Sequence, residues 1–225
     1  MNRFDLIILD LDGTLYDLDD VLAGVYESQV EFLMQKWNKP KEDVVAFLTE
    51  NHVYPYRSRE SQSATELFMR NGIDKDEWTA WRNSHFDEKK IKVENAASED
   101  LIVKLAELSP VILLSSNTYN LIQKILNHIG IRSNLFLDIY CSDKPQIVGR
   151  FNKTMAVKMI AERHSVLPTR ILSIGDRYKT DIQPILEFGG KGVLIENPQS
   201  IKQVSKDLSN EGLCSCNSYK YFGNV

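Results

Sequence analysis

Cysteine is scarce in this chain, which has only three among its 225 residues: Cys141, Cys214 and Cys216. An odd and small number of thiols excludes the disulfide framework of a small secreted protein, and three thiols cannot complete a four-cysteine zinc site. Cys214 and Cys216 flank one serine and could together bind a soft metal, but two ligands alone favour ordinary thiols. We therefore expect all three cysteines to be reduced.

Long hydrophobic runs are also absent. No stretch approaches the roughly 18 apolar residues needed to cross a bilayer, which excludes a membrane-spanning helix. The apolar run between Asp5 and Asp10 is too short for a secretory signal. The sequence therefore predicts a cytoplasmic protein with no membrane partner.

Charge of one sign is not in large excess. The net charge of -4 and the pI near 5.6 give no electrostatic reason to bind nucleic acid or an anionic membrane surface. A small anionic ligand must then be bound by local groups. We expect a small-molecule partner, no nucleic acid, and a chain that works as a monomer or a homodimer.

Short apolar, β-rich runs are present instead, and helical patterns separate them. The length of the chain suits one domain, or a core with one insertion. Strands that alternate with helices are typical of an α/β protein with a doubly wound parallel sheet. The four runs are Leu6–Leu9, Val111–Leu114, Ile171–Ile174 and Gly192–Ile195.

The long interval between the first two runs has no convincing strand. Its apolar residues recur at helical spacing, and Asp74 with Glu77 three residues later is typical of a helix N-terminus. We therefore predict an all-helical domain inserted directly after the first strand. The predicted boundaries are 1–16 and 96–225 for the α/β core and 17–95 for the helical insertion.

Two carboxylates end the first strand. Asp10 and Asp12 are two residues apart, so with Leu11 pointing to the opposite side they can share one face. Ligand chemistry in open α/β sheets lies at such strand ends. Clustered negative charge needs a cation or a shared proton, although one aspartate in this place could simply cap a helix. The pair, followed by Gly13, favours a functional site.

The stretch Asp10-Leu11-Asp12-Gly13-Thr14-Leu15 resembles the first motif of the haloacid dehalogenase superfamily. The resemblance implies a Mg²⁺-dependent phosphatase that acts through an aspartyl-phosphate. It also implies that the helical insertion is a cap domain. A second aspartate two residues after the nucleophile is typical of the phosphatases and phosphomutases of this superfamily, whereas its dehalogenases lack it.

The second strand ends in hydroxyl groups. The family's second motif is a serine or threonine at a strand end, often followed by asparagine, which matches Ser116-Asn117 best and leaves Ser115 as the alternative. A hydroxyl in this place donates to a phosphoryl oxygen, together with backbone N–H groups at the next helix. The simpler interpretation is a serine that caps the helix beginning near Tyr119.

The third strand of the predicted order runs into Gly175 and Asp176, with Asp181 five residues further on. This spacing resembles the family's fourth motif, whose first acid binds the metal. Gly175 permits a tight turn, so Asp176 can reach the site. We expect Asp181 to orient the metal ligands without binding the metal itself. The alternative is a charge at a helix N-terminus.

The family's third motif is a lysine ahead of the helix before the fourth motif. Lys144 is followed by proline, and this Lys-Pro pair is commoner in the family. Lys153, however, lies immediately before the amphipathic run Ala156, Met159 and Ile160. Its spacing to Asp176 suits one helix and one strand. We choose Lys153, while the segment departs from the family pattern and Lys144 remains the alternative.

The resemblance implies a role for each candidate. Asp10 is the nucleophile and Asp12 the general acid and base; Ser116, Asn117 and Lys153 hold the transferring phosphoryl oxygens. The Mg²⁺ ligands are the Asp10 carboxylate, the Asp12 backbone carbonyl and Asp176. The expected substrate is a small phosphorylated metabolite, a nucleotide or sugar phosphate. A phosphotransferase similar to β-phosphoglucomutase, or a catalytically idle binding protein on the same fold, is the alternative.

Substrate choice is expected in the helical insertion. Tyr56 and Arg57 lie in a proline-containing loop and could stack on and hydrogen-bond a substrate, or they could pack the domain core and meet solvent. The stretch Leu67–Trp78 also looks similar to the pyrimidine 5'-nucleotidase-like branch of the superfamily.

Overall fold

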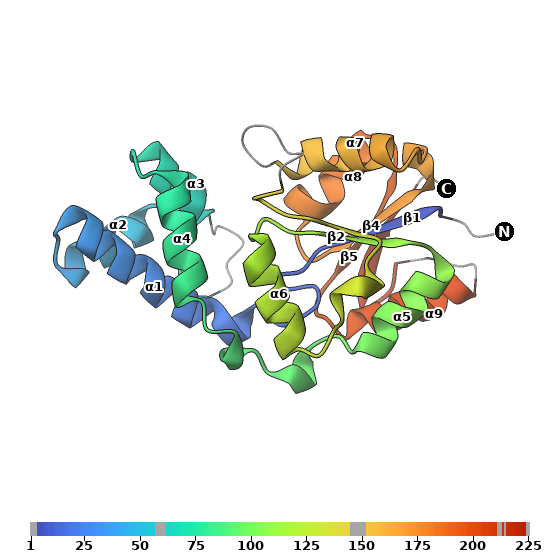
Figure 1. Ribbon diagram of the computed structural model, residues 1–225, viewed down its shortest axis with the longest axis horizontal. Coiled ribbons are helices and arrows are strands. Elements are labelled where there is room, and N and C mark those ends of the chain that lie inside the picture. Colours follow the sequence, from blue (N-terminus) through green and yellow to red (C-terminus); the bar gives the residue numbers. More distant parts are fainter. Residues whose placement is uncertain (1–3, 57–61, 145–151, 211–212, 214, 224–225) are drawn as a thin grey trace. The chain divides into compact units, whose positions relative to one another are not determined.

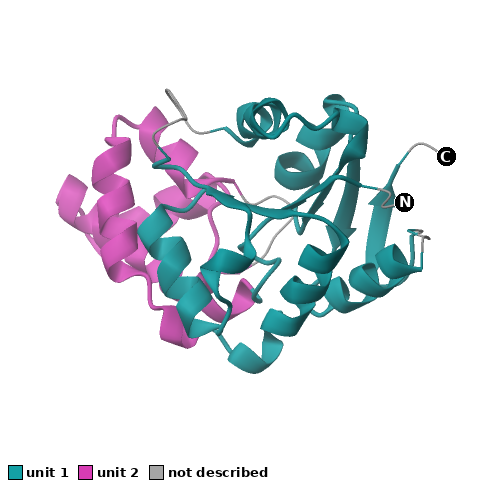
Figure 2. Ribbon diagram, turned by 45° about the vertical axis from the view of Figure 1, so that its right-hand side comes forward, with its two compact units in different colours: residues 1–17, 91–225 teal, residues 18–90 magenta. Residues whose placement is uncertain are grey.

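The chain forms two compact units. The computed structural model describes residues 4–56, 62–144, 152–210, 213 and 215–223. Unit 1 comprises Met1–Asp17 and Ile91–Val225, and unit 2 comprises Leu18–Lys90 (Figure 2). Each unit has a hydrophobic core of its own.

Unit 1 is built on a six-stranded sheet in the order β3-β2-β1-β4-β5-β6 (Figure 1). The first five strands are parallel and β6 pairs antiparallel with β5. Every residue of β1, β2 and β4 is buried, because a central parallel strand is covered on both faces. The strands are β1 (Leu6–Leu9), β2 (Val111–Leu114), β3 (Asp138–Tyr140), β4 (Ile171–Gly175), β5 (Lys191–Ile195) and β6 (Tyr219–Phe222).

Helices cover both faces of this sheet, α7 and α8 on one face and α5, α6 and α9 on the other (Figure 1). Leu6 and Ile8 alternate along β1 and pack with Ala156 and Val157 of α7 and Ile185 of α8. The predicted doubly wound α/β fold is confirmed. The helices are α5 (Glu99–Leu108), α6 (Tyr119–His128), α7 (Lys153–Arg163), α8 (Gln183–Glu187) and α9 (Ser200–Ser209), with 3₁₀ turns at Val93–Asn95, Ser133–Leu135 and Pro168–Arg170 and a π-helical turn at Tyr178–Ile182.

The described residues of unit 2 form helices joined by loops and contain no strand. Its core is aromatic: the Phe32 ring lies 5.1 Å from Trp78 and 5.9 Å from Phe68, measured between centroids. Asp74 caps α4 by accepting hydrogen bonds from the backbone N–H groups of Asp76 and Glu77, as its sequence pattern predicts. The helices are α1 (Asp19–Trp37), α2 (Lys41–Glu50), α3 (Ala64–Arg70), α4 (Lys75–His85) and a 3₁₀ turn at Glu88–Lys90.

The four strands expected from the sequence are all present, and two further strands are not foreseen by the apolar runs. β3 has only three residues and begins with Asp138, and β6 places the exposed Lys220 among aromatic residues. Both strands lie at the edges of the sheet, where strands are short and carry charged residues. Their sequences therefore lack a continuous apolar run.

Among the described residues, no helix combines the length and the apolar composition that a bilayer crossing requires.

Candidate active site

Three adjacent strands of unit 1 deliver polar side chains to one edge of the sheet. β2, β1 and β4 are parallel neighbours, and the residues that follow them are Ser115, Asp10 and Asp176. Ligands bind beyond the carboxyl ends of strands in open α/β sheets. The fold thus gathers the predicted motifs at the edge where such sites form.

Asp10 continues the alternation of β1 and lies on the side of α7. It is only 6% exposed. Its Oδ1 accepts a hydrogen bond from Lys153 Nζ at 2.5 Å, and its Oδ2 accepts one from Thr14 Oγ1 at 3.0 Å. These two donors fix the carboxylate of Asp10.

Lys153 begins α7, and the side chain of Asn152 caps that helix by accepting from Thr154 N at 2.7 Å. The ammonium group of Lys153 donates to Asp181 at 2.7 Å as well as to Asp10. The cap therefore sets where α7 starts, and the helix start places Lys153 between two aspartates.

Lys144, the alternative lysine, lies elsewhere in unit 1. Its Nζ pairs with the carboxylate of Asp138 and donates to the Ile139 carbonyl at 2.9 Å. It also lies 4.0 Å from the centre of the Tyr140 ring, where cation–π attraction adds to the pairing. The structure brings Lys153 to Asp10 and keeps Lys144 in contact with the edge strand β3.

Asp181 is buried within the π-helical turn that follows β4. Its carboxylate also accepts hydrogen bonds from Arg177 N and Thr180 Oγ1, both at 2.9 Å. A Cβ atom at position 175 would lie 2.4 Å from the Cβ of Asp181. Only Gly175 permits this close approach, so the glycine before Asp176 also positions Asp181.

Burial raises the pKa of Asp10 well above its ordinary value, and the neighbouring ammonium of Lys153 opposes that shift. The carboxylates of Asp181, Asp176 and Asp12 raise this pKa further. Burial alone would disfavour the charge on Lys153, but the two carboxylates beside it raise the pKa of Lys153 above its ordinary value. Excess negative charge at this strand end would be relieved by a bound cation.

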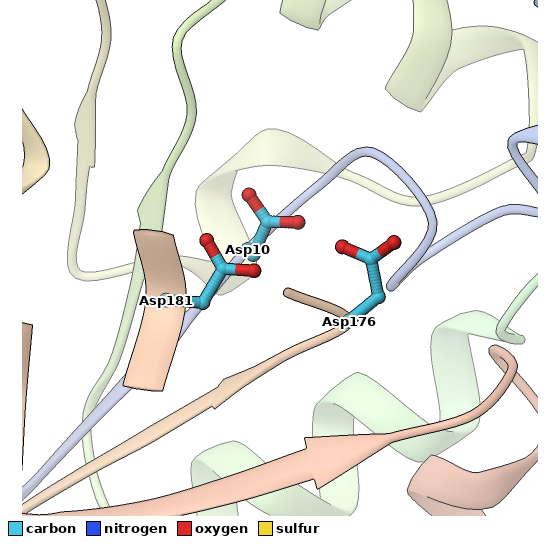
Figure 3. Close-up of side chains that lie close together, drawn as sticks. All are labelled: Asp10, Asp176 and Asp181. Carbon is cyan, nitrogen blue, oxygen red and sulfur yellow. The ribbon is translucent and has the colours of Figure 1, made fainter. Parts of the chain in front are cut away.

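Three carboxylates lie close enough to hold a metal ion. Oxygens of Asp10, Asp176 and Asp181 all lie within 4.8 Å of one another, and Figure 3 shows the three side chains side by side. Mg²⁺ takes oxygen ligands at about 2.1 Å and commonly uses one or two carboxylates with water and phosphate. Since Asp181 already accepts three hydrogen bonds, Asp10 and Asp176 are the better placed ligands. The donor set fits Mg²⁺.

The carboxylate of Asp12 is surrounded by hydrogen-bond donors. Tyr16 donates its hydroxyl to Oδ1 at 2.5 Å, and Asn117 Nδ2 lies 2.9 Å from both oxygens. Ser115 Oγ lies 3.4 Å from Oδ2. The side chain of Asn117 therefore contacts Asp12. Tyr16 is not among the residues singled out from the sequence, and its place four residues after Asp12 is the only signal that could have suggested it.

The two candidate serines differ in their surroundings. Ser115 is fully buried, and its Oγ accepts a hydrogen bond from Asn117 N at 3.1 Å. Ser116 is exposed at the same strand end. An exposed hydroxyl is accessible to a ligand, whereas Ser115 serves contacts within the protein.

The predicted substrate loop belongs to unit 2. Tyr56 is 59% exposed, and its ring stacks on Tyr54 with centroids 5.3 Å apart and an interplanar angle of 7°. The hydroxyl of Tyr54 lies 3.0 Å from Nδ1 of His52. Arg57 lies outside the described residues.

The two described cysteines, Cys141 and Cys216, take no part in the acidic site. Cys141 is a free, buried thiol after β3, and burial raises its pKa to about 12. Cys216 is free and exposed, and Cys214 lies outside the described residues.

Comparison with protein families decides the affiliation of the chain. Residues 7–189 match the family model described as haloacid dehalogenase-like hydrolase. The chain belongs to the haloacid dehalogenase-like hydrolases. The family resemblance of the sequence motifs is thereby confirmed, and the protein is a hydrolase by family. A search of curated proteins found no match.

Solved structures share the fold of this hydrolase at low sequence identity. A phosphatase of the family from Thermococcus onnurineus has a TM-score of 0.58 and 15% identity, covering 88% of this chain and 96% of its own. A family enzyme from Bacteroides thetaiotaomicron, solved with magnesium and inorganic phosphate, has a TM-score of 0.52 and 18% identity, covering 86% and 95%. A 2-haloacid dehalogenase from Pseudomonas syringae has a TM-score of 0.54 and 16% identity, covering 93% and 100%. Both chemistries therefore occur on this fold.

Proposed function

We propose that this hydrolase is a Mg²⁺-dependent phosphatase that cleaves phosphomonoesters of small metabolites through an aspartyl-phosphate. The observation that carries the proposal is the contact of Asp10 with Lys153 beside Asp176, at the carboxyl end of the central strand. An ammonium and a second carboxylate suited to a metal, both beside one nucleophilic carboxylate, suit an anionic phosphoryl group. The Bacteroides enzyme, which binds magnesium and inorganic phosphate, supports the same chemistry for its fold.

Asp10 and Asp12 divide the chemistry between them. A carboxylate oxygen of Asp10 attacks phosphorus, and the bond from phosphorus to the ester oxygen breaks. Asp12 gives its proton to the departing oxygen. Asp12 then takes a proton from the water that attacks phosphorus, which releases inorganic phosphate and restores the carboxylate of Asp10.

The neighbouring groups reduce charge repulsion in both steps. Lys153 and the hydroxyl of Ser116 hold the phosphoryl oxygens, while Asp181 keeps the ammonium of Lys153 in place. Mg²⁺, held by Asp10, Asp176 and the backbone carbonyl of Asp12, would neutralise phosphate charge.

Asp12 favours phosphate esters over haloacids as substrates. A displacement of halide needs no proton for the leaving group, whereas an alkoxide leaves poorly without one. Three donors surround the carboxylate of Asp12 in this structure, so the residue has an ordered environment beside Asp10.

Unit 2 is proposed to act as the cap that selects the leaving group. The stacked pair Tyr54 and Tyr56 presents an exposed aromatic ring suited to the base of a nucleotide or the face of a sugar. Arg57, next in sequence, would supply bidentate hydrogen bonds.

The deciding experiment is a panel of phosphate esters incubated with purified protein and Mg²⁺, with release of inorganic phosphate as the measurement. The same panel with Asp10→Asn should give no release, since the variant lacks a nucleophile but changes little volume. Circular dichroism establishes that the variant is folded. A phosphotransferase would move phosphate between sugars without releasing it, and phosphate release from folded Asp10→Asn would exclude the covalent route.

A further inference from the structure

Tyr16 has an unusual place in unit 1 for a tyrosine, because it is fully buried and yet directs its hydroxyl at a carboxylate of the site. The distance from the hydroxyl to Oδ1 of Asp12 is 2.5 Å. A buried hydroxyl needs a partner, and a charge-assisted hydrogen bond to a carboxylate is a strong one. The pairing is therefore more than a surface contact.

The backbone holds Tyr16 in this place. Gly13 has φ of +80°, which turns the chain directly after Asp12. Thr14 N and Leu15 N both donate to the Leu11 carbonyl, and the Leu15 carbonyl accepts from Ala97 N at 2.8 Å. Asp12 and Tyr16 also form an isolated backbone bridge. The turn, and not the side chain alone, sets the position of the hydroxyl.

A second donor holds Asp12 from another part of the chain. Asn117 follows β2, and its amide nitrogen lies 2.9 Å from each oxygen of the Asp12 carboxylate. Tyr16 and Asn117, which lie 101 residues apart in the sequence, together restrain the carboxylate. A side chain held from two sides keeps one rotamer, whereas Asp12 held only by Asn117 and the 3.4 Å contact of Ser115 Oγ can turn more freely about its side-chain bonds.

We propose that Tyr16 is a positioning residue for Asp12, which holds the general acid and base in reach of the ester oxygen and of the attacking water. The inference rests on the proposed phosphatase function and deepens it, because it names a residue that acts only through Asp12. A group that is poorly oriented for proton transfer loses rate, while the binding of the phosphoryl group is unchanged.

The test compares Tyr16→Phe with Tyr219→Phe. Tyr219, on the edge strand β6, is a matched control. It is also buried, and its hydroxyl donates to the carboxylate of Asp207 at 2.6 Å. Tyr16→Phe should lower kcat/KM for an alkyl phosphate by about 10–100-fold, the usual cost of losing a partner that orients a functional group. For p-nitrophenyl phosphate, whose leaving group needs no proton, kcat/KM should change several-fold less. Tyr219→Phe should leave kcat/KM unchanged for both esters.

Two further measurements separate positioning from a general effect. In an Asp12→Asn background, Tyr16→Phe should cause no additional loss, because its effect passes through Asp12. A crystal structure of Tyr16→Phe should show the Asp12 carboxylate moved or in more than one rotamer. This structural result does not depend on turnover, so the inference can fail separately from the proposed function.

The outcomes are distinct. Equal losses for both esters, additive losses in the Asp12→Asn background, or an unmoved Asp12 carboxylate in the Tyr16→Phe crystal would overturn the positioning role. A wild-type protein that releases phosphate from no ester would instead overturn the proposed function, and the rotamer of Asp12 in the crystal would still decide the role of Tyr16.

Discussion

Lys153 Nζ and Asp10 Oδ1 lie 2.5 Å apart although 143 residues separate them in the sequence. The contact exists because α7 begins at Lys153 on the face of the sheet to which Asp10 points. Lys153 also pairs with Asp181, so one ammonium joins the segments that follow β1 and β4. This buried pair lies at the centre of the candidate site.

Replacing Lys153 and Lys144 in turn should show which of the two lysines binds the phosphoryl group. Lys153→Ala removes a buried ammonium beside Asp10 and should lower kcat/KM for phosphate esters by at least about 10²-fold, the scale of losing one preorganised electrostatic contact. Lys144→Ala is the matched control, since Lys144 pairs with Asp138 on β3 and should leave the rate within a few-fold of wild type. A larger loss for Lys144→Ala would place the phosphate-binding lysine there.

Asp12→Asn should slow turnover by about 10²–10⁴-fold, because proton transfer to the leaving group is lost. The loss in kcat/KM should be largest for alkyl phosphates and smaller for p-nitrophenyl phosphate. Steady-state kinetics on both esters measure the difference. An equal loss on both would argue against Asp12 as the general acid.

Removal of divalent metal should abolish activity. Without a cation, Asp10 and Asp176 repel each other and an anionic substrate, which burial makes more costly. Dialysis against EDTA followed by phosphate-release assays tests this, and added Mg²⁺ should restore the rate. Ca²⁺ should restore it poorly, since its longer and looser coordination misplaces the nucleophile. Full activity in EDTA would refute the metal requirement.

Gly175→Ala should cost activity as well as stability. The new Cβ would lie 2.4 Å from Asp181 Cβ, so Asp181 must move and release Lys153. Overpacking of this kind destabilises by about 1–3 kcal/mol, which thermal or urea unfolding measures. Gly190→Ala is the control: its Cβ would lie 2.5 Å from Ile185 Cγ1, away from the acids. Comparable unfolding losses with a much larger drop in kcat only for Gly175→Ala would implicate Asp181.

Tyr56→Ala tests the substrate role of unit 2. If Tyr56 stacks on the leaving group, kcat/KM for the preferred natural ester should fall far more than for acetyl phosphate, which has no remote group to bind. Tyr56→Phe should restore most of the rate, because the ring is kept. Equal losses on both substrates, or a lower melting temperature with unchanged selectivity, would return Tyr56 to a structural role.

The ends of the central strands could be predicted from the sequence. Apolar runs such as Leu6–Leu9 must be buried on both faces, and the acids and hydroxyls that follow them must then meet at one sheet edge. The edge strands β3 and β6 could not be predicted in this way, because short strands with charged residues are defined by their pairing with a neighbour and not by their own pattern.

The α/β fold, the family and the order of the motifs follow from the amino-acid sequence, since they depend on local periodicity and short-range spacing. Spacing along the chain favoured Lys153 over Lys144, and the fold shows the contact of Lys153 with Asp10. The place of Tyr16 and Asn117 at the carboxylate of Asp12 came from the fold alone. These contacts depend on where a helix starts and on how a turn is closed. Packing between segments far apart in the chain fixes such details, and local spacing alone does not specify that packing.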